Sequence, residues 1–201
     1  MPRLKTVLRV LFAALPVVLA LFAVASKSQA PADFGTDLHG HPIRELAGAG
    51  VRVVVLIFAA SDCPISNRYV PEIARLTNEF SRQAVRFWWV YPNSGDTAPI
   101  VEKHNRDFSI DGESLLDSKQ SLVALAHTTV TPESAVFVVA GGALHEVYHG
   151  RIDDRYLDIG KERPQAQHHD LETAISAAIA GKPVPQPGGP PVGCSIVFLQ
   201  K

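Results

Sequence analysis

Residues 51–69 read VRVVVLIFAASDCPISNRY, and they give the strongest indication of the fold. Its first part, residues 51–60, is a nearly continuous apolar run rich in β-branched residues, which is typical of a strand buried on both faces. Cys63 follows where the strand gives way to helical spacing, and Pro64 is tolerated in the first turn of a helix. Because the positive end of a helix stabilises a thiolate, the stretch makes Cys63 the candidate nucleophile.

Outside this unit, the patterns predict an alternation of strands and helices. Residues 33–46 suit a hairpin or an irregular edge segment. The later elements are expected as a strand at 85–91, a helix at 97–108, a short link at 115–117, a helix at 119–126, strands at 134–140 and 143–148, a polar loop at 150–167 and a helix at 170–180. The order predicts one α/β domain over residues 33–181, with a central mixed sheet flanked by helices.

The composition and the amino terminus narrow the class of protein. The chain has 201 residues, of which 46% are hydrophobic, and a net charge of -1, which argues against a nucleic-acid partner. Within residues 1–30, three basic residues precede the charge-free run 10–25, which is shorter than the roughly 20 residues of a membrane span. This layout predicts a secretory signal cleaved after Ala25, with an uncleaved membrane anchor as the alternative.

Export changes how the two cysteines are interpreted, because disulfides persist outside the cytosol. Cys63 and Cys194 could form a structural bridge, form a redox pair or remain unrelated thiols. Cys194 lies in the tail 182–201, whose first ten residues include five prolines and two glycines. We expect this tail to run extended and its apolar end to dock on the domain.

Three features carry a resemblance to a known family: Cys63 at a helix start after a buried strand, Thr131-Pro132 before a hairpin, and Tyr148-His149-Gly150 before a closing helix. With them, residues 34–181 resemble a thioredoxin-fold redoxin, and the Gly193-Cys194 tail resembles an exported bacterial group of such proteins. The resemblance implies a thioredoxin-like fold with a cis Pro132 against the active cysteine. It also implies that Thr131 and Pro132 form the loop that receives an extended substrate.

The sequence departs from the main branches of that superfamily. Thioredoxins carry a second cysteine where this chain has Ser66, and a tryptophan where it has Asp62. Peroxiredoxins place a proline and a threonine or serine where this chain has Leu56 and Ala60. Copper-delivering relatives need a second cysteine at the position of Asn67.

A thiolate that attacks a disulfide or a peroxide leaves a product that a second thiol must resolve, and Ser66 cannot do this. Cys194 is the remaining thiol, 131 residues from Cys63. About ten extended residues at about 3.1 Å each cross roughly 30 Å. We therefore expect Cys194 beside Cys63 in a reversible disulfide. The alternative is a permanent bridge, which would stabilise the fold by about 4 to 5 kcal/mol.

The neighbours of Cys63 and the eight histidines give further expectations. Ser66 is placed to donate a hydrogen bond to the sulfur. Asp62 would either raise the pKa of the thiol or cap the helix. The histidines lack a matching ligand motif, so no metal site is predicted, although copper would be favoured if Cys63 met a histidine.

The sequence thus predicts an exported thiol-disulfide oxidoreductase or peroxide-reducing redoxin, periplasmic or extracellular, acting on protein thiols, disulfides or peroxides. Cys63 is the nucleophile, Cys194 the resolving thiol, and Thr131, Pro132 and Ser66 complete the site. We expect no cofactor, no nucleic-acid partner and, at most, a membrane tether through residues 10–25. The competing hypothesis is a non-enzymatic thioredoxin-like binding or copper-chaperone module with a structural Cys63–Cys194 disulfide.

Overall fold

The computed structural model describes residues 33–199. The predicted leader at residues 1–30 lies outside this range. Over residues 33–199, no helix combines the length and the apolar character that crossing a membrane requires.

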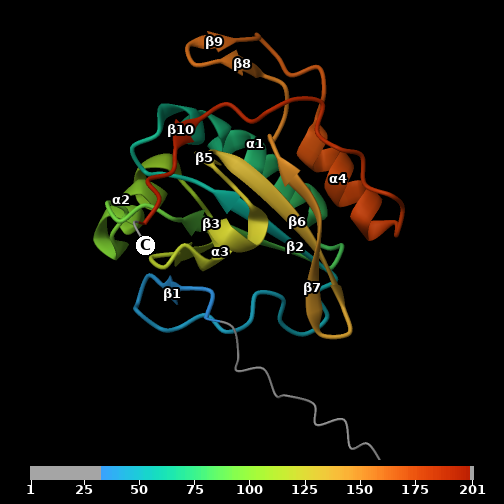
Figure 1. Cartoon of the computed structure of the whole chain (residues 1–201), viewed down its shortest axis with the longest axis horizontal. Coiled ribbons are helices and arrows are strands. Elements are labelled where there is room, and N and C mark those ends of the chain that lie inside the picture. Colours follow the sequence, from blue (N-terminus) through green and yellow to red (C-terminus); the bar gives the residue numbers. More distant parts are fainter. Residues whose placement is uncertain (1–32, 200–201) are drawn as a thin grey trace, which may run out of the picture. The chain divides into compact units, whose positions relative to one another are not determined.

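A six-stranded mixed sheet forms the centre of the domain, with the strand order β1-β4-β3-β2-β6-β7 (Figure 1). Strands β2, β3 and β4 run parallel, whereas β6 pairs antiparallel with β2 and β7 with β6. The strands are β1 (Thr36–Asp37), β2 (Val53–Phe58), β3 (Val85–Tyr91), β4 (Glu113–Leu116), β6 (Glu133–Ala140) and β7 (Ala143–Gly150). The predicted α/β class with a central mixed sheet is confirmed.

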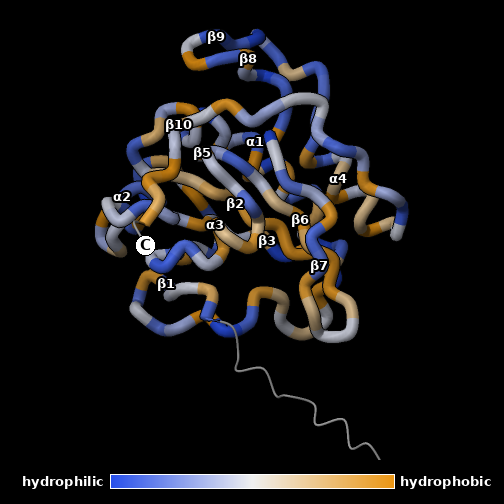
Figure 2. The backbone as a smooth tube through the Cα atoms, in the orientation of Figure 1, coloured by the Kyte–Doolittle hydropathy of each residue, from blue (hydrophilic) through white to orange (hydrophobic). Residues whose placement is uncertain are grey.

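Both faces of the sheet are covered, which explains why β2 is apolar at every position. Val53, Val55 and Ile57 face one cluster, and the alternate residues of β2 face the other. The first cluster packs under α1 (Pro64–Phe80), α2 (Ala98–Phe108) and α4 (Asp170–Ile179), and the second under α3 (Ser121–Ala126). The hydropathy colouring of Figure 2 shows the apolar residues concentrated on the central strands.

Several segments that were expected as links or loops contain short strands. Residues 115 and 116 of the expected link belong to the strand β4, which pairs with β3 and β1. The helix expected from residue 119 begins at Ser121, because the Asp117 carboxylate accepts hydrogen bonds from the amides of the first turn at 2.8–3.0 Å. The polar loop 150–167 contains a two-stranded hairpin, β8 (Tyr156–Asp158) and β9 (Lys161–Glu162).

The tail runs without helix over residues 182–193, as predicted, and then adds a strand to the domain. That strand, β10 (Cys194–Ser195), pairs antiparallel with β5 (Val130–Thr131). The apolar end docks only in part. Ile196 is 3% exposed within the second cluster, whereas Val197, Phe198 and Leu199 are 51–70% exposed.

Candidate active site

Cys63 stands at the junction that the sequence indicated, as the N-cap residue of α1 with Pro64 in the first turn. Its side chain is 1% exposed and belongs to the apolar cluster under α1 and α4. The expectation that Asp62 caps this helix is wrong, because the chain enters the helix one residue later and the cap makes no side-chain hydrogen bond.

The second thiol comes from the tail. The pairing of β10 with β5 places Cys194 opposite Thr131, and the two cysteines approach to 2.6 Å. Both are free thiols, with Cys63 buried and Cys194 partly exposed. Cys63 Sγ also donates a hydrogen bond to the carbonyl oxygen of Thr131 at 3.1 Å. The expected neighbourhood of Cys63 and Cys194 is therefore confirmed.

The two thiols differ in acidity. Burial raises the pKa of Cys63, but hydrogen bonds from Cys194 and Ser66 outweigh burial and hold that pKa below its ordinary value. Burial also raises the pKa of Cys194, and the hydrogen bond and charge of Cys63 add to the effect and bring it to about 12. Cys63 is thus the thiol that ionises, while Cys194 keeps its proton and donates it to the neighbouring sulfur.

The loop before the hairpin has the geometry that the resemblance implied. The Thr131-Pro132 peptide bond is cis, and Thr131 is fully buried. The edge of β5, where an extended substrate was expected, is occupied by Cys194 and Ser195 of the same chain. Thr131 Oγ1 donates a 3.4 Å hydrogen bond to the carbonyl oxygen of Cys194.

The buried carboxylate of Glu133 holds this loop in place. The sequence patterns did not single out this residue. It is 3% exposed, and its carboxylate accepts hydrogen bonds from the amides of Thr129 at 2.9 Å and Val130 at 3.4 Å. Burial outweighs these hydrogen bonds and raises the pKa of the Glu133 carboxyl. Its position directly after Pro132, at the start of an otherwise apolar strand, was the available signal.

Asp96 is a second buried carboxylate close to the cysteine loop. One of its oxygens accepts hydrogen bonds from the amide of Ser61 at 3.0 Å and from its hydroxyl at 2.5 Å. The other oxygen is buried without a partner, and burial raises the pKa of Asp96. The signal for Asp96 was topological, because it follows β3 as Cys63 follows β2, and neighbouring parallel strands end at the same edge of a sheet.

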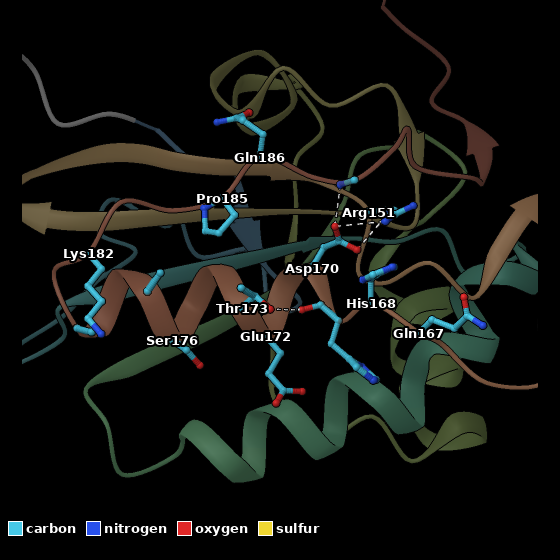
Figure 3. A pocket seen from close by; sticks show the side chains of 14 residues that line it. Arg151, Gln167, His168, Asp170, Glu172, Thr173, Ser176, Lys182, Pro185 and Gln186 are labelled. Carbon is cyan, nitrogen blue, oxygen red and sulfur yellow. Dashed lines mark hydrogen bonds and ion pairs between the residues drawn. The ribbon is translucent and has the colours of Figure 1, made fainter.

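A group of polar residues anchors the tail to α4 (Figure 3). Arg151 donates to the Asp170 carboxylate at 2.9 Å, and the same carboxylate accepts the amide of Gly188 at 2.8 Å. These residues border a cleft of about 890 Å³ between α4 and the tail, and neither cysteine lines it. The cleft is therefore separate from the thiol pair.

Within residues 33–199, one His/Cys/Asp/Glu group has a spacing that could hold a metal ion, namely Glu72, Asp153 and His169. Neither cysteine belongs to it, and Arg75 already forms a 2.7 Å ion pair with Glu72.

No protein-family model and no curated protein matches the sequence. Among solved structures, the chain is similar to an uncharacterized conserved protein from Geobacillus kaustophilus, with a TM-score of 0.68 and 23% identity, over 86% of this chain and 92% of that one. A hypothetical protein from Sinorhizobium meliloti gives a TM-score of 0.69 and 22% identity, over 83% and 91% of the two chains. A secreted Mycobacterium tuberculosis disulfide oxidoreductase homologous to E. coli DsbE gives 0.47 and 17%, over 73% and 93%. The chain shares its fold with the Geobacillus kaustophilus and Sinorhizobium meliloti proteins, and its central mixed sheet with flanking helices is the arrangement predicted for a thioredoxin-like fold.

Proposed function

We propose that this protein is an exported thiol-disulfide oxidoreductase whose redox centre is the Cys63–Cys194 pair. The observation that carries the proposal is the 2.6 Å approach of two free cysteines that lie 131 residues apart in the chain. Cys63 makes and breaks the internal bond as the nucleophile or leaving thiolate, and Cys194 supplies the second sulfur. Ser66 stabilises the Cys63 thiolate, while Thr131 and the cis Pro132 hold the two sulfurs against each other.

The reaction exchanges one disulfide for another. The oxidised protein takes two electrons and two protons from two substrate thiols, which leave as a disulfide, and Cys63 and Cys194 become thiols. The difference in acidity between the two cysteines supports this role, because a thiol of low pKa leaves faster when a disulfide is attacked. Export rests on the signal-like residues 1–30, and an oxidising compartment would regenerate the disulfide.

Oxidation of a reduced dithiol peptide by the oxidised protein tests the proposal. We expect about one peptide disulfide for each Cys63–Cys194 bond consumed, because each bond accepts two electrons. Cys63→Ser and Cys194→Ser should each form none, whereas Ser81→Ala, an exposed change at the end of α1, should match the wild type. A bridge that stays intact in the folded protein under excess dithiothreitol would instead establish the structural role. Peptide oxidation that survived in either cysteine variant would also contradict the proposal.

A further inference from the structure

The two sulfurs of the redox centre differ in their access from outside. Cys63 is 1% exposed and packed within an apolar cluster, so that an approach to its sulfur is blocked while the tail is docked. Cys194 is partly exposed and lines a cleft of about 390 Å³, whereas Cys63 is not among the residues that line it. The cleft therefore leads to the tail cysteine and not to the helix cysteine.

The cleft is walled by the start of α1 on one side and by the β8–β9 hairpin on the other. Its walls include Pro64, Ile65 and Arg68 from α1, and Tyr156, Ile159 and Glu162 from the hairpin. The hairpin segment is held to α1, because Tyr69 donates a 2.5 Å hydrogen bond to the buried Asp153 and its ring lies 5.6 Å from that of Tyr156. Apolar side chains of the helix and the hairpin thus lie in the same cleft as the partly exposed Cys194.

We propose, on the basis of the function proposed above, that the reduced thiol of an extended polypeptide enters this cleft and exchanges at Cys194. In the first step the substrate thiolate attacks Cys194 Sγ, a new S–S bond forms, and the Cys63–Cys194 bond breaks with Cys63 as the departing thiolate. In the second step another substrate thiolate attacks the first substrate sulfur. The substrate disulfide leaves, and Cys194 departs with the bond's electron pair and takes up a proton.

The chemistry of the two thiols supports this direction of attack. Attack at Cys194 expels Cys63, whose thiolate accepts hydrogen bonds from the amide and the hydroxyl of Ser66, whereas attack at Cys63 would expel Cys194, whose pKa is raised by burial. The thiol of lower pKa is the better leaving group. The exposure of Cys194 and the acidity of Cys63 as the leaving thiol therefore both favour attack at the Cys194 sulfur.

The residues that line the cleft include one cation, Arg68, and one anion, Glu162, whose carboxylate also lies 3.5 Å from the Arg155 guanidinium. The Arg68 side chain is 62% exposed, and its distance to the Glu162 carboxylate is 4.0 Å, so the guanidinium is only loosely paired. A cation beside a reaction site raises the local concentration of an approaching anion. Arg68 thus favours the entry of a substrate thiolate, while Ile65 and Ile159 accommodate the apolar neighbours of a cysteine in an unfolded segment.

Mapping of the mixed disulfide tests the inference directly. Oxidised wild-type protein is mixed with a short reduced peptide that carries one cysteine between apolar residues. The reaction is quenched with acid, free thiols are alkylated, and the adduct is located by mass spectrometry. We expect the peptide on Cys194, in at least about tenfold excess over Cys63, with Cys63 alkylated. Equal adducts, or adducts mainly on Cys63, overturn the inference and leave the proposed function standing. A disulfide that never opens overturns both.

A charge reversal at the cleft gives an independent test. Arg68→Glu should slow the opening of the disulfide by the peptide about threefold at low ionic strength, and added salt should narrow the difference. Lys103→Glu makes the same change of charge on α2, away from the cleft, and should leave the rate unchanged. Equal slowing by both variants would show that net charge alone governs the rate and would overturn the role of the cleft.

Discussion

At the scale of single residues, the acidity of Cys63 arises from its hydrogen-bond partners. The helix start was visible in the sequence, and so was Ser66 at helical spacing from the thiol. The contribution of Cys194 was less visible, because it depends on a tail that returns from 131 residues away. Ser66 is itself 1% exposed, and both its amide and its hydroxyl hydrogen-bond to the Cys63 sulfur.

Replacement of Ser66 by alanine tests this origin of the acidity. Loss of the hydroxyl removes one donor to the Cys63 thiolate, so we expect the pKa of Cys63 to rise and its alkylation near pH 7 to slow by about tenfold. That factor corresponds to a hydrogen bond of about 1.4 kcal/mol. Mass spectrometry of the Cys63 peptide after timed alkylation of reduced protein gives the rate at each pH. Ser81→Ala is the matched control, and an unchanged pH profile in Ser66→Ala would contradict the account.

At the scale of elements, the strands and helices with long periodic patterns were predictable, whereas the short ones were not. The unit from β2 to α1 was visible because a buried strand and an amphipathic helix each leave a pattern of many residues. Strand β4 has four residues and the hairpin strands β8 and β9 have three and two. Such elements are defined by their partners in space, so local composition leaves them looking like loops.

The corner between β5 and β6 gives a prediction about pH. The pKa of Glu133 is raised above its ordinary 4.5 because burial outweighs the hydrogen bonds from Thr129 and Val130. Because the pKa of Glu133 is higher in the folded chain than in the unfolded chain, the protonated carboxyl favours folding. The stability that this protonated group contributes is fully present below the pKa of the unfolded chain, and it is lost as pH rises through the pKa of the folded chain. Glutamine stays neutral. We therefore expect Glu133→Gln to gain stability relative to the wild type as pH rises above about 4.5.

Urea unfolding at several pH values measures this difference, with Glu102→Gln on α2 as the control. The prediction is wrong if the free energy of unfolding changes with pH in the same way for Glu133→Gln and the wild type. That result would show that burial does not destabilise the Glu133 carboxylate.

At the scale of the whole described domain, the tail completes the site. It is fixed at Gly188 by Asp170, at β10 by β5, and at its end by Gln120, which donates to the carbonyl oxygen of Val197 at 2.7 Å. The proline content of the tail predicted that it runs extended and docks on the domain. From this we expected Cys194 to lie beside Cys63. The anchors were not predictable, because each joins residues 18 or more positions apart in the chain.

Gly193 is the position where docking is tightest. A methyl group there would lie 2.6 Å from the carbonyl carbon of Thr131 and closer still to its oxygen. The reduced chain can release this strain by undocking, whereas the oxidised chain cannot. With a cost of about 1 to 3 kcal/mol for overpacking, we expect Gly193→Ala to raise the reduction potential of the disulfide by about 20 to 60 mV.

The oxidised fraction in a series of glutathione buffers reports that potential. Gly95→Ala is the control, because a methyl group at Gly95 meets no atom within 4 Å. If the two variants titrated together, the close approach of Gly193 to Thr131 would have no part in the stability of the bond.

The proline-rich span 182–193 also makes Cys194 a tethered reactant. A group on a linker meets its partner at an effective concentration that is set by the length and stiffness of that linker. In a Cys-x-x-Cys site the two cysteines are three positions apart, and that concentration is fixed by local geometry. Here it depends on a surface segment that carries neither thiol. The oxidising strength of the centre can therefore change through the length of the tail alone, without any change to the chemistry around Cys63.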